Sequence, residues 1–263
     1  MPVHALSPRF LEKIWGSQRL SPWFPDSDLK IGEVWLEGPG GEALPLLIKF
    51  LFTTERLSVQ VHPNDEYARK HHDSNGKTEM WHILRADAGA QIALGLKEKM
   101  TRAELRKASE SGAIEERLNW IGVRAGETYF VPAGTIHAIG AGIALCEIQQ
   151  QSDVTYRLYD YGRPRELHLD HGVTVSDVRA YEAIPAPSGA LVACSYFHTQ
   201  RLVVDGLHQL KAAGGRRWLI CLEGAGLIGG TPYRAGQGFE ANVVELVPIT
   251  SNGRSVFLVT GVP

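Results

Sequence analysis

The sequence predicts an all-β fold made of two barrel-like units, and three features of the chain support that prediction. The 28 glycines and 14 prolines bracket many short runs rich in Val, Ile, Leu, Tyr and Phe, which is typical of strands joined by turns. Signals that start or stop helices are few. Hydrophobic residues make up 44% of the 263 residues, which is enough to build a substantial core.

The predicted elements in the first part of the chain are mostly strands. Thr101 and Glu104 form a capping box and Gly112 is a suitable stop, so residues 102–111 are expected to be helical. A second helix is expected over Pro63–His72, because proline is favoured in a first turn. The remaining runs predict strands at Leu46–Phe52, Leu57–Val61, Glu79–Leu84, Gln91–Leu94, Thr128–Val131, Ile143–Gln149 and Thr155–Leu158.

The composition changes near residues 183–190, where Ala, Pro, Ser and Gly indicate a linker. We therefore expect a metal-binding domain over residues 1–182 and a smaller β domain over residues 190–263. Residues 232–238 repeat the turn chemistry of the first domain, but no histidine follows them, so the second domain is expected to lack metal ligands. Its expected strands are Leu191–Phe197, Leu202–Val204, Trp218–Leu222, Val243–Val247 and Ser255–Val259.

Charge and cysteine content exclude several classes of protein. The net charge is -2 with both signs mixed throughout, which gives no basic surface for nucleic acid or membrane. The longest apolar run, residues 44–52, is too short to span a bilayer, and the N-terminus lacks signal-peptide features. The three cysteines are widely spaced, so we expect a reduced, cytoplasmic setting. The sequence does not fix the oligomeric state.

Four polar residues near the ends of predicted strands indicate a divalent metal site in the first domain. Gln60 and His62 are two apart and therefore face the same side of a strand. Glu79 opens a later strand, and His137 follows a turn centred on Gly134 that can direct its imidazole into the mouth of a barrel. Two imidazoles, a carboxylate and an amide suit Zn, Fe, Mn or Co.

This prediction rests on the four residues occurring together, because a single histidine after a strand is more often an ordinary polar residue than a ligand. His82 follows Glu79 by three positions on the same predicted strand. Since strand side chains alternate between the two faces, His82 is expected on the face opposite the metal site.

The same residues carry a family resemblance. Gly126, Pro132, Gly134 and His137 fit the second cupin motif, and Gln60 with His62 takes the place of the first motif's His-x-His pair. This variant resembles the type I mannose-6-phosphate isomerases in their short bacterial form. The likeness covers most of residues 1–180 and includes the segments 15–16, 31–35, 45–49, 57–63, 76–79, 131–140, 147–150 and 152–157.

The resemblance implies a cupin barrel with one Zn²⁺ per chain that interconverts mannose 6-phosphate and fructose 6-phosphate. It also implies that Lys77, Glu147 and Arg157 lie in the substrate pocket and that Arg157 is important for catalysis. The implied zinc ligands are Gln60, His62, Glu79 and His137.

Residue chemistry suggests a role for each of these side chains. Isomerisation moves a proton between C1 and C2 through an enediol, so Glu147 is expected to shuttle that proton. Arg157 is expected to stabilise the enediolate or bind phosphate, because its fork suits oxyanions. Lys77 is expected to bind phosphate or assist ring opening, and Ser58, on the same strand face as Gln60, to contact phosphate.

Structural roles remain as alternatives for these side chains. Glu147 is then a buried partner of an arginine, Arg157 an ion-pair partner of Asp153 or Asp160, and Lys77 a solvated turn residue.

The chain departs from the larger members of the family in two ways. Larger members carry His just before the pocket lysine, whereas this chain has Gly76, so a ring-opening role for that His cannot be carried over. The chain also lacks the helical insert of the larger enzymes.

Two other functions stay open. Two His and one Glu also form the facial triad of non-haem Fe(II) oxygenases. A non-catalytic cupin that binds hexose phosphates is the other alternative.

Overall fold

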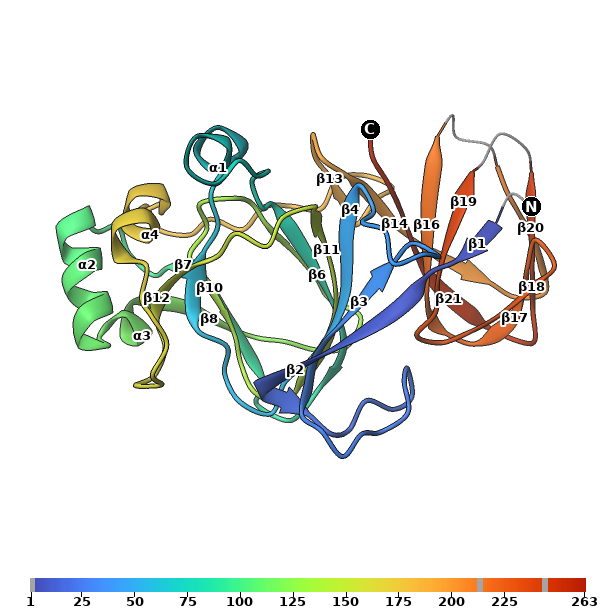
Figure 1. Ribbon diagram of the computed structural model, residues 1–263, viewed down its shortest axis with the longest axis horizontal. Coiled ribbons are helices and arrows are strands. Elements are labelled where there is room, and N and C mark those ends of the chain that lie inside the picture. The colour runs from blue at the N-terminus through green and yellow to red at the C-terminus, as the bar shows by residue number, and fades with distance from the viewer. Residues whose placement is uncertain (1–2, 212–214, 243–245) are drawn as a thin grey trace.

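The computed structural model describes residues 3–211, 215–242 and 246–263 and confirms the all-β prediction (Figure 1). The strands in these ranges form antiparallel sheets. The first six-stranded sheet has the order β2 (Ser7–Ser17), β3 (Ile31–Glu37), β4 (Leu46–Phe52), β11 (Ile143–Gln150), β6 (Glu79–Ala86), β9 (Thr128–Val131). It faces a five-stranded sheet of order β12 (Tyr156–Tyr159), β5 (Val59–Val61), β10 (His137–Ile139), β7 (Gln91–Leu96), β8 (Leu118–Gly122). These two sheets enclose the first barrel.

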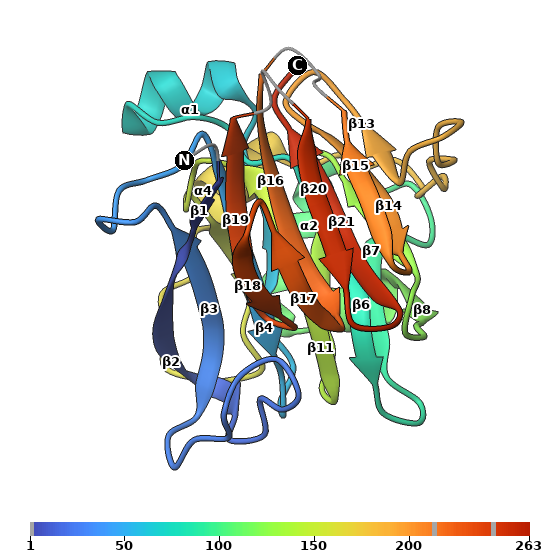
Figure 2. The same ribbon diagram turned by 90° about the vertical axis from the view of Figure 1, so that its right-hand side faces the viewer.

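Two further sheets form a second β unit beside that barrel, and its strands face the viewer in Figure 2. The second six-stranded sheet has the order β1 (Val3–Ala5), β19 (Gly238–Asn242), β16 (Arg216–Glu223), β21 (Ser255–Gly261), β14 (His198–Val204), β13 (Val192–Ala193). The four-stranded sheet has the order β15 (Leu207–Leu210), β20 (Val247–Ser251), β17 (Ala225–Ile228), β18 (Thr231–Arg234). The architecture matches the cupin fold.

The two β units share a hydrophobic layer. Ile48 and Phe50 on β4 pack in one apolar cluster with Trp218 and Leu258 of the second six-stranded sheet. All seven residues of β4 are buried, because one face meets this layer and the other lines the first barrel. Alternation along β4 therefore places Lys49 on the barrel side, and pairing across the sheet places Lys49 opposite Glu147 of β11.

The N-terminal strand crosses from one unit to the other. β1 pairs with β19 of the second six-stranded sheet, with Val3 opposite Ala241. Residues 181–187, which precede β13, carry no helix or strand. The division into domains at residues 1–182 and 190–263 stays a prediction.

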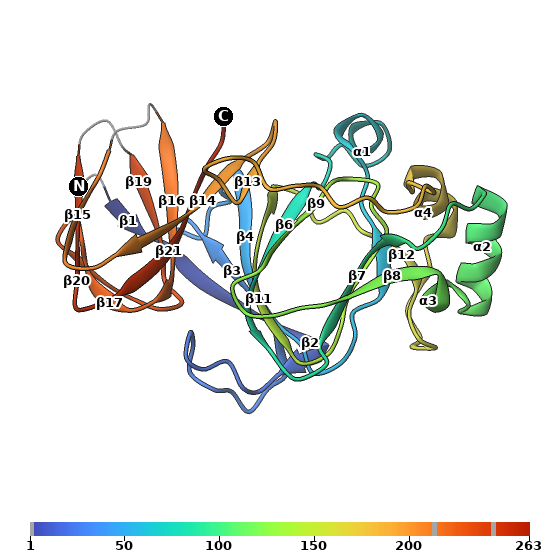
Figure 3. The same cartoon turned by 180° about the vertical axis from the view of Figure 1, so that it is seen from behind.

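The helices are short and lie mainly at the end of the first barrel away from the second unit (Figures 1 and 3). They are α1 (Asp65–His72), α2 (Arg102–Ser111), α3 (Ile114–Arg117) and α4 (Leu169–Val175). The predicted helix 102–111 is confirmed, with the Thr101 and Glu104 capping box formed. The helix predicted over Pro63–His72 begins at Asp65, because Asn64 is its cap and accepts from the backbone of Tyr67. None of these helices is long and apolar enough to span a membrane.

The second unit differs from the prediction at its start. The predicted strand Leu191–Phe197 is wrong, because only Val192–Ala193 is extended and paired there. The chain then turns tightly, with the Cys194 N–H donating to the Phe197 carbonyl at 3.0 Å, before β14 begins. The strand predicted at Val243–Val247 lies largely outside the described residues, and β20 begins at its last residue.

Candidate metal centre and adjoining cavity

The predicted ligands converge inside the first barrel. Gln60 lies on β5 and His62 directly follows it, so alternation places both on the barrel side. His137 opens β10 and is the direct cross-strand partner of Gln60. Glu79 opens β6 in the facing sheet. Ligand atoms of His62, Glu79 and His137 all lie within 4.8 Å of one another, so the barrel brings these three together as predicted.

The cluster is buried and closely spaced. His62 is 1% exposed, and Glu79 and His137 are fully buried. Nε2 of His62 is 3.5 Å from Oε2 of Glu79, and Nε2 of His137 is 3.6 Å from Oε1 of the same carboxylate. The amide nitrogen of Gln60 is 3.3 Å from Nε2 of His137. An amide N–H can donate to a ring nitrogen, and coordination of a metal through the Gln60 oxygen would require the amide to turn over.

Hydrogen bonds behind the rings prepare both imidazoles to be ligands. Nδ1 of His62 is 3.1 Å from the Val154 carbonyl, and Nδ1 of His137 is 2.8 Å from the Thr135 carbonyl. A carbonyl only accepts, so each Nδ1 carries the hydrogen and each Nε2 presents its lone pair to Glu79.

Burial also keeps the two rings neutral. It lowers the pKa of His137 to about 4. Burial, helped by the Lys77 charge, lowers the pKa of His62 well below its usual value. Two neutral imidazoles and a carboxylate form a site that could hold a divalent metal ion. Oε2 of Glu79 accepts no hydrogen bond of good geometry, although the Lys77 ammonium lies 2.7 Å from it.

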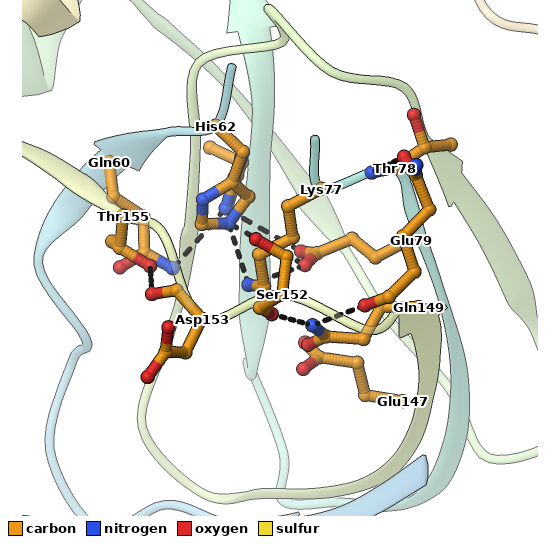
Figure 4. A network of polar contacts seen from close by, with 12 residues as sticks. Gln60, His62, Lys77, Thr78, Glu79, Glu147, Gln149, Ser152, Asp153 and Thr155 are labelled. Atoms are coloured by element: carbon orange, nitrogen blue, oxygen red, sulfur yellow. Dashed lines mark hydrogen bonds and ion pairs between the residues drawn. The ribbon is translucent and has the colours of Figure 1, made fainter. Parts of the chain in front are cut away.

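Further polar contacts continue from the cluster along the barrel wall, and Figure 4 shows Lys77, Glu79 and Glu147 among the residues involved. Lys77 Nζ is 2.7 Å from Oε2 of Glu79. The Trp81 indole N–H lies 3.1 Å from Oε1 of Glu79 and 3.0 Å from Oε2 of Glu147. Glu147 in turn pairs with Lys49 at 3.1 Å. Glu147 therefore has a lysine partner rather than the arginine considered from the sequence, and Lys77 is buried rather than solvated.

Sequence reasoning missed Lys49 as a site residue. Its side chain is 7% exposed and lies between Glu147 and Glu33, with Nζ 3.9 Å from the latter. The signal was present, since Lys49 is the one charged residue in the run 46–52. A lysine is rarely buried unless it is paired, so a lysine in a fully apolar strand indicates an inward-facing partner.

A cavity of about 330 Å³ adjoins the cluster. Ser58, Lys77, Glu147 and Arg157 all line it, which brings together the remaining predicted site residues. Four larger cavities, of about 540, 600, 380 and 440 Å³, lie elsewhere and are lined by none of these residues. Other residues on its wall include Lys13, Glu33, Lys49, Gln60, Asp153 and Arg165.

Arg157 lies on the wall of this cavity. It is the cross-strand partner of Gln60 on β5. Its Nη1 donates to the Glu166 carbonyl at 2.7 Å, while its buried Nε finds no acceptor in the described structure. The ion pair considered with Asp160 does not form, because Arg163 and Arg165 bind that carboxylate. An arginine that lines the cavity and has no carboxylate partner among the described residues is suited to an anionic ligand.

His82 lies where the spacing predicted. It is on the face of β6 opposite Glu79, with Nδ1 2.8 Å from the Thr128 hydroxyl. Burial lowers its pKa to about 4, and the nearby charges of Arg201 and Glu223 belong to the second β unit.

Comparison with known proteins places this chain in a family. Residues 26–84 match the model of the phosphomannose isomerase type I catalytic domain. YvyI of Bacillus subtilis (strain 168), whose name assigns it to the mannose-6-phosphate isomerases, is 33% identical over 275 residues, covering 85% of this chain and 86% of that protein. The chain belongs to the type I phosphomannose isomerase family. Mannose-6-phosphate isomerase ManA of the same organism is 39% identical over 202 residues, or 71% of this chain.

Solved structures of phosphomannose isomerases have the same fold. The mannose 6-phosphate isomerase from Bacillus subtilis superposes with a TM-score of 0.89 at 27% identity and full coverage of both chains. An R274A mutant of phosphomannose isomerase from Salmonella typhimurium has a TM-score of 0.76 at 17% identity, covering 98% of this chain and 99% of that one. In the sequence alignments, this chain spans 64% of ManA and 62% of the Streptococcus mutans mannose-6-phosphate isomerase.

Proposed function

We propose that this chain is a zinc-dependent isomerase that interconverts mannose 6-phosphate and fructose 6-phosphate. The observation that supports it best is the buried cluster of His62, Glu79 and His137 beside a cavity lined by Lys77 and Arg157. Family membership supports the substrate, because the relatives are named for that sugar phosphate.

The metal part of the proposal rests on the donor set. His62, Glu79 and His137 would hold the ion, with Gln60 as a weaker fourth ligand. When bound, zinc supplies a Lewis acid for the negative charge that develops on the sugar oxygens O1 and O2. Zinc is proposed because imidazole and carboxylate ligands suit it well.

Glu147 is proposed to carry the proton between C1 and C2. Lys49 holds one of its oxygens at 3.1 Å, and the Trp81 indole holds the other at 3.0 Å. These two donors fix the carboxylate on the cavity wall, so its reactive lone pairs point in a defined direction before substrate arrives.

Arg157 is proposed to stabilise the enediolate, because its residue lines the cavity and its guanidinium has no carboxylate partner among the described residues. Lys77 is proposed to bind the phosphate or to assist ring opening, and Ser58 is proposed to contact the phosphate. Gly76 takes no part in ring opening, since it has no side chain. A Cβ there would also lie 2.5 Å from the backbone of Asn64 and Asp65, so the backbone of α1 fills the space that a side chain would need.

A coupled assay on mannose 6-phosphate tests this function, run on the metal-free protein with and without added zinc. We expect turnover only with zinc and its loss on adding a chelator. The variant His137→Ala is the matched control and should remain inactive after zinc is added. Turnover that is equal with and without chelator would contradict the metal proposal.

Two further readouts separate the alternative functions. Calorimetry that detects hexose-phosphate binding without turnover would favour the non-catalytic cupin. Oxygen uptake in the presence of Fe(II), with no isomerisation, would favour the oxygenase.

A further inference from the structure

The Lys77 ammonium lies among the residues proposed to hold the metal. Its Nζ is 2.9 Å from Nε2 of His62 and 2.7 Å from Oε2 of Glu79, and its side chain is 5% exposed. Figure 4 shows this side chain directed between His62 and Glu79. One nitrogen therefore contacts two of the proposed ligand atoms.

The contact with His62 uses the lone pair that a metal ion requires. A neutral imidazole has one N–H and one lone pair. Nδ1 of His62 faces the Val154 carbonyl at 3.1 Å and carries the hydrogen, so the lone pair is on Nε2. The ammonium has only hydrogens to offer and therefore donates to that lone pair. A lone pair engaged by Lys77 is not available for coordination.

The charges of the cluster also oppose the presence of both the Lys77 ammonium and a metal ion beside Glu79. Glu79 is fully buried, and the ammonium beside it compensates its negative charge. A divalent cation bound to Glu79 would take over that role. Two cations sharing one buried carboxylate repel each other strongly, because solvent does not screen them there.

The backbone around Lys77 is fixed, so any displacement must come from its side chain. The Gly76 N–H donates to Oδ1 of Asp65 at 2.8 Å, and the Lys77 N–H donates to the Pro63 carbonyl at 3.0 Å. The Thr78 N–H donates to the side chain of Gln150 at 2.9 Å. Three consecutive backbone donors are thus satisfied, whereas the four-carbon lysine stem can rotate.

We propose that Lys77 and the metal ion compete for the His62 lone pair, so that metal loading moves the ammonium out of the cluster into the adjoining cavity. This inference rests on the metal site of the proposed function. Lys77 already lines that cavity with Ser58, Glu147 and Arg157, so the displaced ammonium remains within reach of a phosphate or a sugar hydroxyl. Metal loading therefore also presents the lysine to the ligand.

Metal affinity tests the competition directly. The dissociation constant for Zn²⁺ is measured by chelator competition on the metal-free wild type and on Lys77→Met. We expect Lys77→Met to bind zinc about tenfold to a hundredfold more tightly, since one charge-assisted hydrogen bond no longer has to break.

Lys49→Met is the matched control, because it removes another buried cation of the same cavity. Lys49 contacts Glu147 at 3.1 Å and not His62, so its gain in zinc affinity should be much smaller. Equal gains in the two variants would show a general charge effect and overturn the proposal.

A second measurement uses the unaltered chain and does not depend on how the variants fold. An amine-acylating reagent is applied to the metal-free and the zinc-loaded wild type, and labelling at each lysine is read by mass spectrometry. Labelling of Lys77 should rise severalfold with zinc, while buried Lys49 serves as the internal reference. Unchanged labelling of Lys77 would contradict the displacement.

The outcomes separate this inference from the proposed function. If the wild type does not bind zinc, both are overturned. If the wild type binds zinc and isomerises mannose 6-phosphate while Lys77→Met shows unaltered zinc affinity, only the competition is overturned.

Discussion

Replacing Lys49 with Met should destabilise the fold, and the structure allows the size of the effect to be worked out. Lys49 is buried between Glu147, at 3.1 Å, and Glu33, at 3.9 Å. Removing one partner of a buried ion pair costs about 3–5 kcal/mol, because the remaining charge loses its compensation. We take the lower end of this energy range, because Glu33 retains two partners after Lys49 is replaced. They are the Lys13 ammonium at 3.2 Å and the Trp35 indole N–H at 2.6 Å.

The expected loss is therefore about 3 kcal/mol, for which Glu147 is mainly responsible. With an unfolding entropy of about 2.1 cal/mol/K per residue, a chain of this length should lose about 5–6 °C in Tm. Thermal and urea unfolding at pH 7 measure the loss. Lys30→Met is the control, because Lys30 pairs with Glu55 on the surface, with side chains 52% and 51% exposed, and such pairs contribute at most about 1 kcal/mol.

The deficit should also depend on pH. Burial alone would raise the pKa of Glu33. The charges of Lys49 and Lys13 lower that pKa by more than burial raises it, so the folded-state pKa lies below the ordinary 4.5. A lowered carboxyl pKa stabilises the fold above pH 4.5, and this contribution is lost as the pH falls through the folded value. The part of the difference between wild type and Lys49→Met that comes from Glu33 should therefore be present near neutral pH and shrink below pH 4.5. A deficit no larger than that of Lys30→Met, or one unchanged across this range, would refute the reasoning.

Three other substitutions test the site. Arg157→Ala should retain metal but lower kcat about a hundredfold to a thousandfold, as expected for one lost oxyanion donor; near-normal turnover would make Arg157 a structural residue. His137→Ala should sharply lower the metal content measured by elemental analysis, whereas His71→Ala should not, and equal contents would contradict the ligand assignment. Gly76→Ala should lower the urea midpoint, because its Cβ would lie 2.5 Å from the backbone carbon of Asn64. The expected cost is about 1–3 kcal/mol, and an unchanged midpoint would show that the backbone at the start of α1 shifts at little cost.

The sequence by itself determined the features that depend on local periodicity and turn chemistry. The spacing of Gln60 and His62 placed both on one strand face, and the spacing of Glu79 and His82 placed them on opposite faces, as the structure has them. The capping box at Thr101 determined the start of α2. These features follow from a repeat of two in strands and from hydrogen bonds between near neighbours in the chain.

Only the tertiary structure decided which faces meet and how closely. Strand register paired Glu147 with Lys49 across residues far apart in the chain, and no local pattern reports the identity of a cross-strand neighbour. The direction of the Lys77 side chain, into the His62–Glu79 cluster rather than toward solvent, depends on contacts of the neighbouring backbone with Asp65 of α1 and with Gln150. The joining of β1 to β19 likewise depends on which sheet edge is free. Periodicity fixes the face of each strand, but partner and register are set by the packing of the whole chain.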